Sequence, residues 1–332
     1  MATIFTLPPE IIQTHILIRL DGPTLAMASC ISSQFRALCN EEKFWQQICS
    51  ATWTSSENSS VRQIISTFSG GHRSFFLDSF LQLSHGQPLK FNLDRSLGTS
   101  RLISAVDIYY KDKPIFSGVK ETCTTTSTKF LYSPFQVDLH DPKDTVSTPI
   151  QHTGQMDTWL KHLEENLSLS WIILGLGMKR AANMSTRRPV FIRWPCNTAG
   201  VVQLHYTTIM AGDGRAGSKV ELVKCKLVVT CSGVDEGEVK VEEVSMQMKD
   251  MEGRRLNGRD SLVILLEALE NGTRKKSKRE EMKEMYEDYV KRKKERKEMK
   301  RRRERVMDIV CDPFFVCIAT WIIVFFFLLI IY

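Results

Sequence analysis

An uninterrupted apolar stretch near the C-terminal end limits what this chain of 332 residues can fold into. From Phe314 to Tyr332 the sequence reads FFVCIATWIIVFFFLLIIY, nineteen residues without a charged side chain. A helix of that length spans about 28 Å, close to the hydrocarbon thickness of a bilayer. A buried strand is much shorter, and a core helix of a soluble domain shows a polar stripe. We therefore expect a single transmembrane helix over residues 313–332.

The place of this stretch in the sequence sets the expected topology. The opening MATIFTLPPE has neither the basic nor the apolar region of a signal peptide. We therefore expect a tail anchor whose basic flank, and with it the N-terminus, stays in the cytosol. No basic residue follows the stretch, which favours the endoplasmic reticulum over the mitochondrial surface; the nucleus or nuclear envelope is the alternative. The N-x-S/T sites at 58, 166, 183 and 271 then stay unglycosylated.

The basic excess of the chain belongs to one segment. The chain carries 45 Lys and Arg against 38 Asp and Glu, and 17 of the basic residues with 8 of the acidic ones lie between Thr273 and Val306. The remainder is nearly neutral, with 28 basic and 30 acidic residues. No Gly or Pro interrupts this segment after Gly272, so we expect a basic helical stalk over residues 273–312.

The end of this stalk predicts contact with a membrane surface. Its basic residues before the apolar stretch are expected to face lipid headgroups: Lys300, Arg301, Arg302, Arg303 and Arg305. A nuclear-localisation or RNA-binding run is the competing interpretation. No aromatic residues interleave these basic residues for base stacking, so no nucleic acid is expected as a partner. Cys311 is a candidate for S-palmitoylation.

The N-terminal stretch predicts three short helices. Pro9 suits the start of the first, and Ile12, Ile16 and Leu20 share one apolar face. The sequence Asp-Gly-Pro at 21–23 ends this helix, Thr24 is placed to cap the second, and residues 41–48 form the third. Three helices in roughly 45 residues have too little interior for all their apolar side chains. Part of that apolar surface must therefore face a partner.

The stretch LPPEIIQTHILIRLDGPTLAMASCISSQFRALCNEEKFWQQI resembles an F-box, and its wording resembles plant F-box proteins. The resemblance covers residues 5–50 and implies binding to a Skp-type adaptor, which connects F-box proteins to the cullin and RING subunits of a ubiquitin ligase. The residues that the resemblance places at the adaptor interface are Leu7, Pro8, Ile11, Leu17, Leu20, Leu25, Ile31, Phe35, Leu38 and Trp45. Phe35 stands where the family often has Trp, which is an exchange of one apolar aromatic residue for another.

The middle of the chain predicts a sheet domain. A linker region at 51–90 is followed over 91–272 by strand-like runs near 102–110, 114–119, 167–174, 189–194, 201–210, 219–231 and 238–248, with turns at 111–113 and 233–237. Runs without interleaved helices favour an antiparallel sandwich over a parallel sheet. A helix at Ser261–Asn271 closes the domain. The arrangement resembles plant F-box proteins whose C-terminal domain is a β-sandwich of the phloem-lectin type. The expected fold class is α+β.

No constellation for catalysis or metal binding is found. The nine cysteines include no C-x-x-C pair, which favours reduced thiols. The sequence GDGRAG at 212–217 has the letters of a nucleotide-binding loop, but a strand rather than a helix is expected to follow it. His205 lacks metal-site spacing relative to Cys225 and Cys231, which are expected to be small buried side chains. We therefore expect no cofactor, no metal and no enzymatic activity.

These observations favour a substrate receptor. In this hypothesis the F-box binds the adaptor, residues 91–272 capture an unknown protein target, and the anchor holds the assembly at a membrane. The alternative is a membrane-tethered module that binds carbohydrate or lipid, whose F-box serves only its own turnover.

Overall fold

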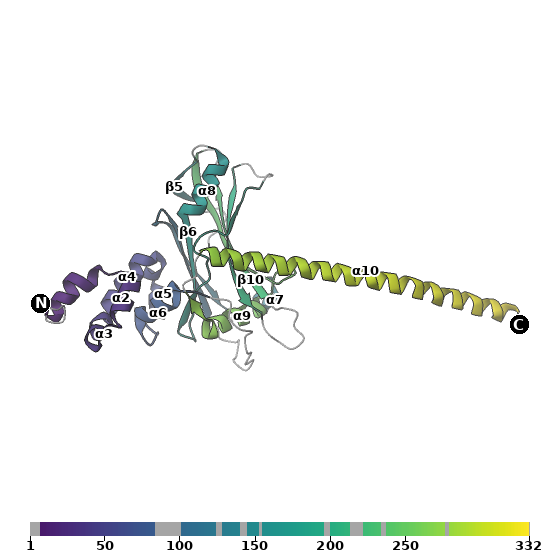
Figure 1. The fold of residues 1–332 in the computed structure, drawn as a ribbon, viewed down its shortest axis with the longest axis horizontal. Coiled ribbons are helices and arrows are strands. Elements are labelled where there is room, and N and C mark those ends of the chain that lie inside the picture. The colour runs from purple at the N-terminus through teal and green to yellow at the C-terminus, as the bar shows by residue number, and fades with distance from the viewer. Residues whose placement is uncertain are drawn as a thin grey trace. The chain divides into compact units, whose positions relative to one another are not determined.

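The structure is a computed structural model that describes residues 7–83, 101–123, 128–139, 145–152, 155–195, 200–212, 222–233, 237–275 and 279–331 (Figure 1). The chain divides into two compact units, Met1–Lys283 and Glu284–Tyr332. The first unit contains the N-terminal helices and two β-sheets. The second unit belongs to one long helix.

The predicted F-box region is helical as expected, but two separate helices stand where the second helix was predicted. The first helical segment runs as α1 (Pro9–Ile11), a π-helical turn (Ile12–Ile16) and a 3₁₀ turn (Leu17–Arg19). It is followed by α2 (Gly22–Ala28), α3 (Ser33–Cys39) and α4 (Glu42–Thr52). Asp21, rather than Thr24, caps α2, because its side chain accepts a hydrogen bond from the Thr24 N–H at 3.0 Å.

The residues predicted as a linker region carry further helices. A 3₁₀ turn (Thr54–Glu57), α5 (Ser59–Ile65) and α6 (Gly71–Phe80) follow α4 directly. Their buried side chains join one core with those of the preceding helices, and Trp53, Phe75 and Phe76 lie in that core. The helical part of the protein therefore continues well beyond the F-box pattern.

Two sheets form the middle of the chain. The first sheet has the strand order β12-β1-β7-β6-β2-β3. Its strands are β1 (Gln82–Leu83), β2 (Arg101–Tyr110), β3 (Lys113–Cys123), β6 (Leu167–Gly175), β7 (Arg180–Asn183) and β12 (Arg274–Lys275). The second has the order β4-β11-β10-β9-β8, and β5 also pairs with β11. Its strands are β4 (Gln136–Asp138), β5 (Val146–Gln151), β8 (Phe191–Arg193), β9 (Val202–Ala211), β10 (Leu222–Ser232) and β11 (Glu238–Lys249).

The pairings bear out the expected antiparallel sheets. All strand pairs are antiparallel except β1 with β7 among the described residues. The predicted turn at 111–113 connects β2 and β3, and Lys111 and Asp112 there adopt positive φ angles of 49° and 60°. Three helices accompany the sheets: α7 (Thr128–Tyr132), α8 (Met156–Asn166) and α9 (Gly258–Asn271). Helix α9 contains the predicted closing helix.

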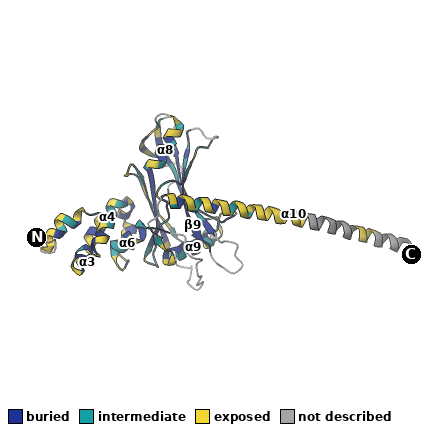
Figure 2. Ribbon diagram, in the orientation of Figure 1, coloured by how far each residue is buried: buried dark blue, intermediate teal, exposed yellow. Residues whose placement is uncertain are grey.

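Within the first sheet, β2 and β6 are buried on both faces (Figure 2). On β2, Val106 and Ile108 pack into the core between the sheets, whereas Ile103 and Ala105 pack against the N-terminal helices. Successive side chains of a strand point to opposite faces, so a strand covered on both sides reads as a continuous apolar run. All nine residues of β6 are buried for the same reason.

Polar side chains also join the helices to the first sheet. Asp107 is fully buried on β2, and its carboxylate accepts hydrogen bonds from the Ser55 N–H at 2.8 Å and the Ser55 hydroxyl at 2.6 Å. Asp78 of α6 lies 3.3 Å from Arg180 of β7 and 3.6 Å from Arg274 of β12. The joint is therefore held by apolar packing and by two buried carboxylates.

The last helix, α10 (Arg279–Ile331), contains the residues that were predicted to cross a membrane. Spanning a bilayer takes about 20 consecutive apolar residues. Among the described residues, no helix has an apolar stretch long enough to cross a membrane. The predicted transmembrane helix at 313–332 and the membrane location, with the endoplasmic reticulum or nuclear envelope as its site, are wrong on this finding.

The predicted lipid contacts depended on that location. Lys300, Arg301, Arg302, Arg303 and Arg305 are exposed on α10, and their contact with lipid headgroups stays a prediction. Cys311, the palmitoylation candidate, lies outside the residues whose side chains the structure describes.

Candidate functional site

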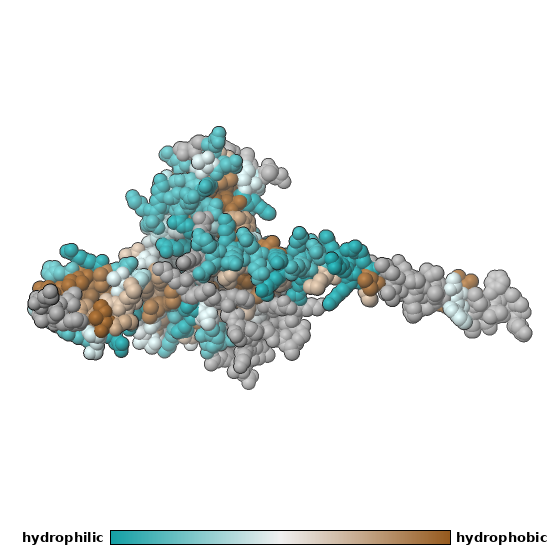
Figure 3. All heavy atoms as spheres, in the orientation of Figure 1, coloured by the Kyte–Doolittle hydropathy of each residue, from teal (hydrophilic) through white to brown (hydrophobic). Residues whose placement is uncertain are grey.

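Large apolar side chains are exposed on the N-terminal helices. Leu7, Ile11 and Ile18 expose 38%, 41% and 49% of their surface, and Met27 and Ile31 expose 65% and 60%. Figure 3 shows brown side chains gathered over this end of the first unit. Exposed apolar residues that cluster in this way mark an interaction surface. We call these five residues the apolar face.

The residues that the resemblance placed at the adaptor interface fall into three groups. Four are exposed: Leu7, Pro8, Ile11 and Ile31. Leu20 and Leu38 are half-buried. The other four are buried in the core of the helices: Leu17, Leu25, Phe35 and Trp45. The structure thus brings the exposed four to the surface, while the buried four shape the helices beneath.

The buried group is fixed by specific contacts. The indole N–H of Trp45 donates a hydrogen bond to the Cys39 carbonyl at 2.7 Å, and the Trp45 ring lies 5.4 Å from the Phe76 ring. The guanidinium of Arg73 lies 5.9 Å from the centre of the Trp45 ring. Burial raises the pKa of the Cys39 thiol, and the positive charge of Arg73 lowers it. These contacts hold α3, α4 and α6 together below the surface.

Two exposed residues of the apolar face, Ile18 and Met27, were missed by sequence reasoning. The π-helical turn at Ile12–Ile16 has more residues per turn than an α-helix, so it rotates the side chains that follow it. A regular helical period therefore misplaces Ile18 around the helix axis. Met27 lies in the last turn of α2, where its exposure depends on the chain turning before Ser32. Neither feature has a clear signal in the sequence.

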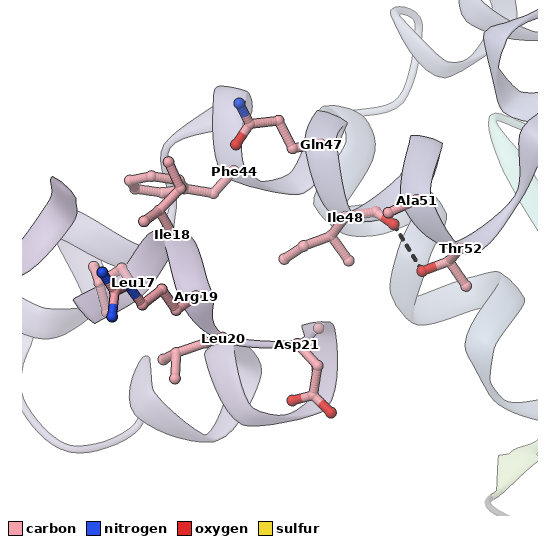
Figure 4. Close-up of a pocket in the computed structure, with 11 residues that line it drawn as sticks. Leu17, Ile18, Arg19, Leu20, Asp21, Phe44, Gln47, Ile48, Ala51 and Thr52 are labelled. Atoms are coloured by element: carbon pink, nitrogen blue, oxygen red, sulfur yellow. Dashed lines mark hydrogen bonds between the residues drawn. The ribbon is translucent and has the colours of Figure 1, made fainter. Parts of the chain in front are cut away.

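A groove lies between the end of the first helical segment and α4 (Figure 4). Its volume is about 380 Å³. Ile18 lies beside Phe44 at one end, and Ile48 projects from α4 toward the segment that carries Leu20. The hydroxyl of Thr52 donates a hydrogen bond to the Ile48 carbonyl at 2.7 Å, which leaves no free donor at that point of the wall. The apolar side chains of the groove are accompanied by the polar Arg19, Asp21 and Gln47.

The site is suited to binding. Its surface is formed by apolar side chains, and no group of three or more His, Cys, Asp or Glu that could hold a metal ion occurs in the described ranges. The buried Cys49 thiol has a raised pKa because of burial, which keeps it protonated at neutral pH.

The helices and their apolar face form a helical module that packs on one of two largely antiparallel sheets. The F-box-like family matches residues 4–51 of the chain. The F-box protein At3g44326 of Arabidopsis thaliana is 42% identical over 277 residues, which cover 82% of this chain and 75% of that protein. The F-box protein At2g27310 of the same plant is 39% identical over 320 residues, covering 94% of this chain and 93% of that protein. The chain belongs to the F-box proteins.

A further relative supports this assignment. The probable F-box protein At2g36090 of Arabidopsis thaliana is 41% identical over 280 residues, which cover 83% of this chain and 78% of that protein. No solved structure matches the chain. The predicted F-box and the resemblance to plant F-box proteins are confirmed, whereas the phloem-lectin resemblance of the sheet domain stays a prediction.

Proposed function

We propose that the protein is the substrate-recognition subunit of an SCF-type ubiquitin ligase. In this proposal the apolar face binds a Skp-type adaptor, which connects the chain to cullin and RING subunits. The β-sandwich captures the protein that is to be ubiquitinated. The chain carries out no bond chemistry and acts by holding its target near the ligase.

The observation that carries the proposal is the apolar face on the matched F-box region. Leu7, Ile11 and Ile31 are exposed there, whereas other apolar residues of the same helices are buried in the core. The shared core beneath them adds support, since it fixes the F-box helices against the first sheet.

Adaptor pull-down with the full-length chain tests the proposal. Ile11→Glu combined with Ile31→Glu places charges on the apolar face without disturbing buried side chains. We expect adaptor recovery to fall by about tenfold or more, because interface side chains at the centre of a contact dominate its binding energy. The double variant Leu7→Ala with Pro8→Ala tests the other exposed pair in the same assay.

The matched control is Leu77→Glu on α6, which is 40% exposed and lies outside the apolar face. We expect this variant to recover adaptor as well as the unmodified chain. Equal recovery of adaptor by the unmodified chain and by both apolar-face double variants would contradict the proposal.

A further inference from the structure

The middle of α10 combines a dense positive charge with wide exposure. Residues 291–305 contain eleven Lys and Arg and three Glu, so their net charge is +8. These residues are exposed except Lys293 and Arg296, which are half-buried (Figure 2). They belong to the second compact unit of the chain, and we call residues 291–307 the basic segment. A surface of this charge is suited to an acidic partner.

The cations of the basic segment are spread around the helix axis. Each step of three residues turns the side chain by about 60°, so Lys291, Lys294, Lys297, Lys300 and Arg303 lie at five different positions around the axis. A helix that lies on a bilayer keeps its cations on one face and its apolar residues on the other. A partner that encloses the helix reaches cations on several sides at once. The distribution therefore favours an enclosing partner over a flat surface.

Apolar side chains are exposed among these cations. Met299, Val306 and Met307 expose 56%, 59% and 61% of their surface. Met299 and Val306 are seven residues apart, so they lie on the same side of the helix about two turns from each other. Exposed apolar residues at i and i+7 are typical of a helix that binds in an apolar groove of another protein. Base stacking on nucleic acid uses aromatic side chains, and the basic segment has none.

We propose that the basic segment binds an acidic protein that encloses this helix in an apolar groove, with Met299 and Val306 as the anchors. Charge complementarity between the cations and an acidic rim supports the choice of partner. The two anchors support the apolar floor of the groove. Basic amphipathic helices are typical targets of calcium sensors, whose open groove is rich in methionine. The basic segment lies outside the matched F-box region and the two sheets, so this interaction is independent of the proposed function.

Isothermal titration calorimetry of the full-length chain with calmodulin tests this inference. Calmodulin is a suitable probe because it is acidic and because calcium opens its apolar groove. We expect the calcium-loaded probe to bind at least about tenfold more tightly than the calcium-free probe, which has the same sequence but a closed groove.

Variants of the anchors test the apolar part of the contact. Met299→Gln combined with Val306→Gln should weaken binding of calcium-loaded calmodulin by about tenfold, because both anchors lose apolar surface. Met299→Leu combined with Val306→Ile keeps both anchors apolar and should bind within about twofold of the unmodified chain. The matched control, Leu77→Gln with Tyr132→Gln, changes two exposed apolar residues of α6 and α7 and should also bind within about twofold.

Variants of the cations test the charge. Arg302→Gln combined with Arg303→Gln should weaken binding of calcium-loaded calmodulin by about fivefold, and added salt should reduce this difference. Lys113→Gln with Lys120→Gln, which removes two exposed lysines of β3, should bind within about twofold of the unmodified chain. Absence of binding by the unmodified chain, equal binding of the calcium-free probe, equal losses in the control variants, or tighter binding of duplex RNA or of anionic vesicles would each overturn the inference.

Discussion

At the scale of single residues, Gly22 shows how closely the F-box helices pack against α6. A Cβ at this position would lie 2.1 Å from Cζ of the Phe76 ring, which is itself buried in the core. We expect Gly22→Ala to lower the free energy of unfolding by about 1–3 kcal/mol, because a packed ring must move. Urea denaturation measures the change. Gly177→Ala is the control, since no atom lies within 4 Å of its added Cβ, and an equal loss there would contradict this explanation.

Asp107 gives the joint between helices and sheet a pH dependence. Burial raises the pKa of Asp107 above 3.8, and hydrogen bonds from Ser55 and Ser117 lower it by less. Between 3.8 and its folded pKa, the folded chain holds a proton on this group that the unfolded chain has lost, so its contribution to stability falls as the pH rises through this range.

Asp107→Asn should remove this contribution while keeping an acceptor for the Ser55 N–H. We therefore expect the free energy of unfolding of the unmodified chain to fall relative to that of the variant as the pH rises from 3.8, and the difference to become constant above the folded pKa. Denaturation curves across acidic pH measure the difference. A difference that grows in the opposite direction would refute the assigned shift.

At the scale of secondary-structure elements, Ser32 explains why α2 and α3 are separate helices. Its hydroxyl accepts a hydrogen bond from the Phe35 N–H at 3.1 Å, which satisfies a donor at the start of α3. We expect Ser32→Ala to destabilise the chain by about 1 kcal/mol. Thermal unfolding of Ser32→Ala and of Ser33→Ala, the next serine, compares a capping with a non-capping position. Similar effects of the two substitutions would argue against the cap.

The long strands and α9 were predictable, and the shorter elements were not. β2, β6, β9, β10 and β11 are long apolar runs bounded by turn residues, which is a strong local pattern. β1, β4 and β12 have two or three residues each, too few for a period to be seen. Helix α5 begins within a Ser-rich stretch at residues 55–60 that is typical of a linker, and α5 and α6 are held by a core that they share with the first sheet.

The candidate site was predictable in part, for a related reason. The family pattern contains both the surface and the core of an F-box, so it cannot separate Ile31, which is exposed, from Phe35, which is buried. The expected location failed because none of the described helices is long and apolar enough to cross a membrane.

At the scale of the whole molecule, the shared core predicts that the helices and the first sheet unfold together. Phe75 is fully buried and lies 5.5 Å from the Trp53 ring, in a core that also includes Ile103 of β2 and Ile172 of β6. Phe75→Ala should lower the free energy of unfolding by about 3–5 kcal/mol, because it leaves a cavity in that core.

Hydrogen exchange measures how far this loss extends. We expect the backbone amides of β2 and β6 to lose protection together with those of α6, although the substitution lies in a helix. Leu77→Ala, on the exposed side of α6, should change protection little. Protection of the strands that stays at the unmodified level in Phe75→Ala would show that the helices and the sheet are separate cooperative units.

The first sheet is packed on one face by the F-box helices and on the other by the second sheet, so neither neighbour can rotate freely about it. If the β-sandwich holds a target while the apolar face holds the ligase, the receptor cannot swing the target toward the ubiquitin carrier. The shape of the target and its orientation on the β-sandwich then determine which of its lysines are ubiquitinated. Two targets that bind the same surface would be ubiquitinated at different positions, because in each target the modified lysine is the one that faces the ubiquitin carrier.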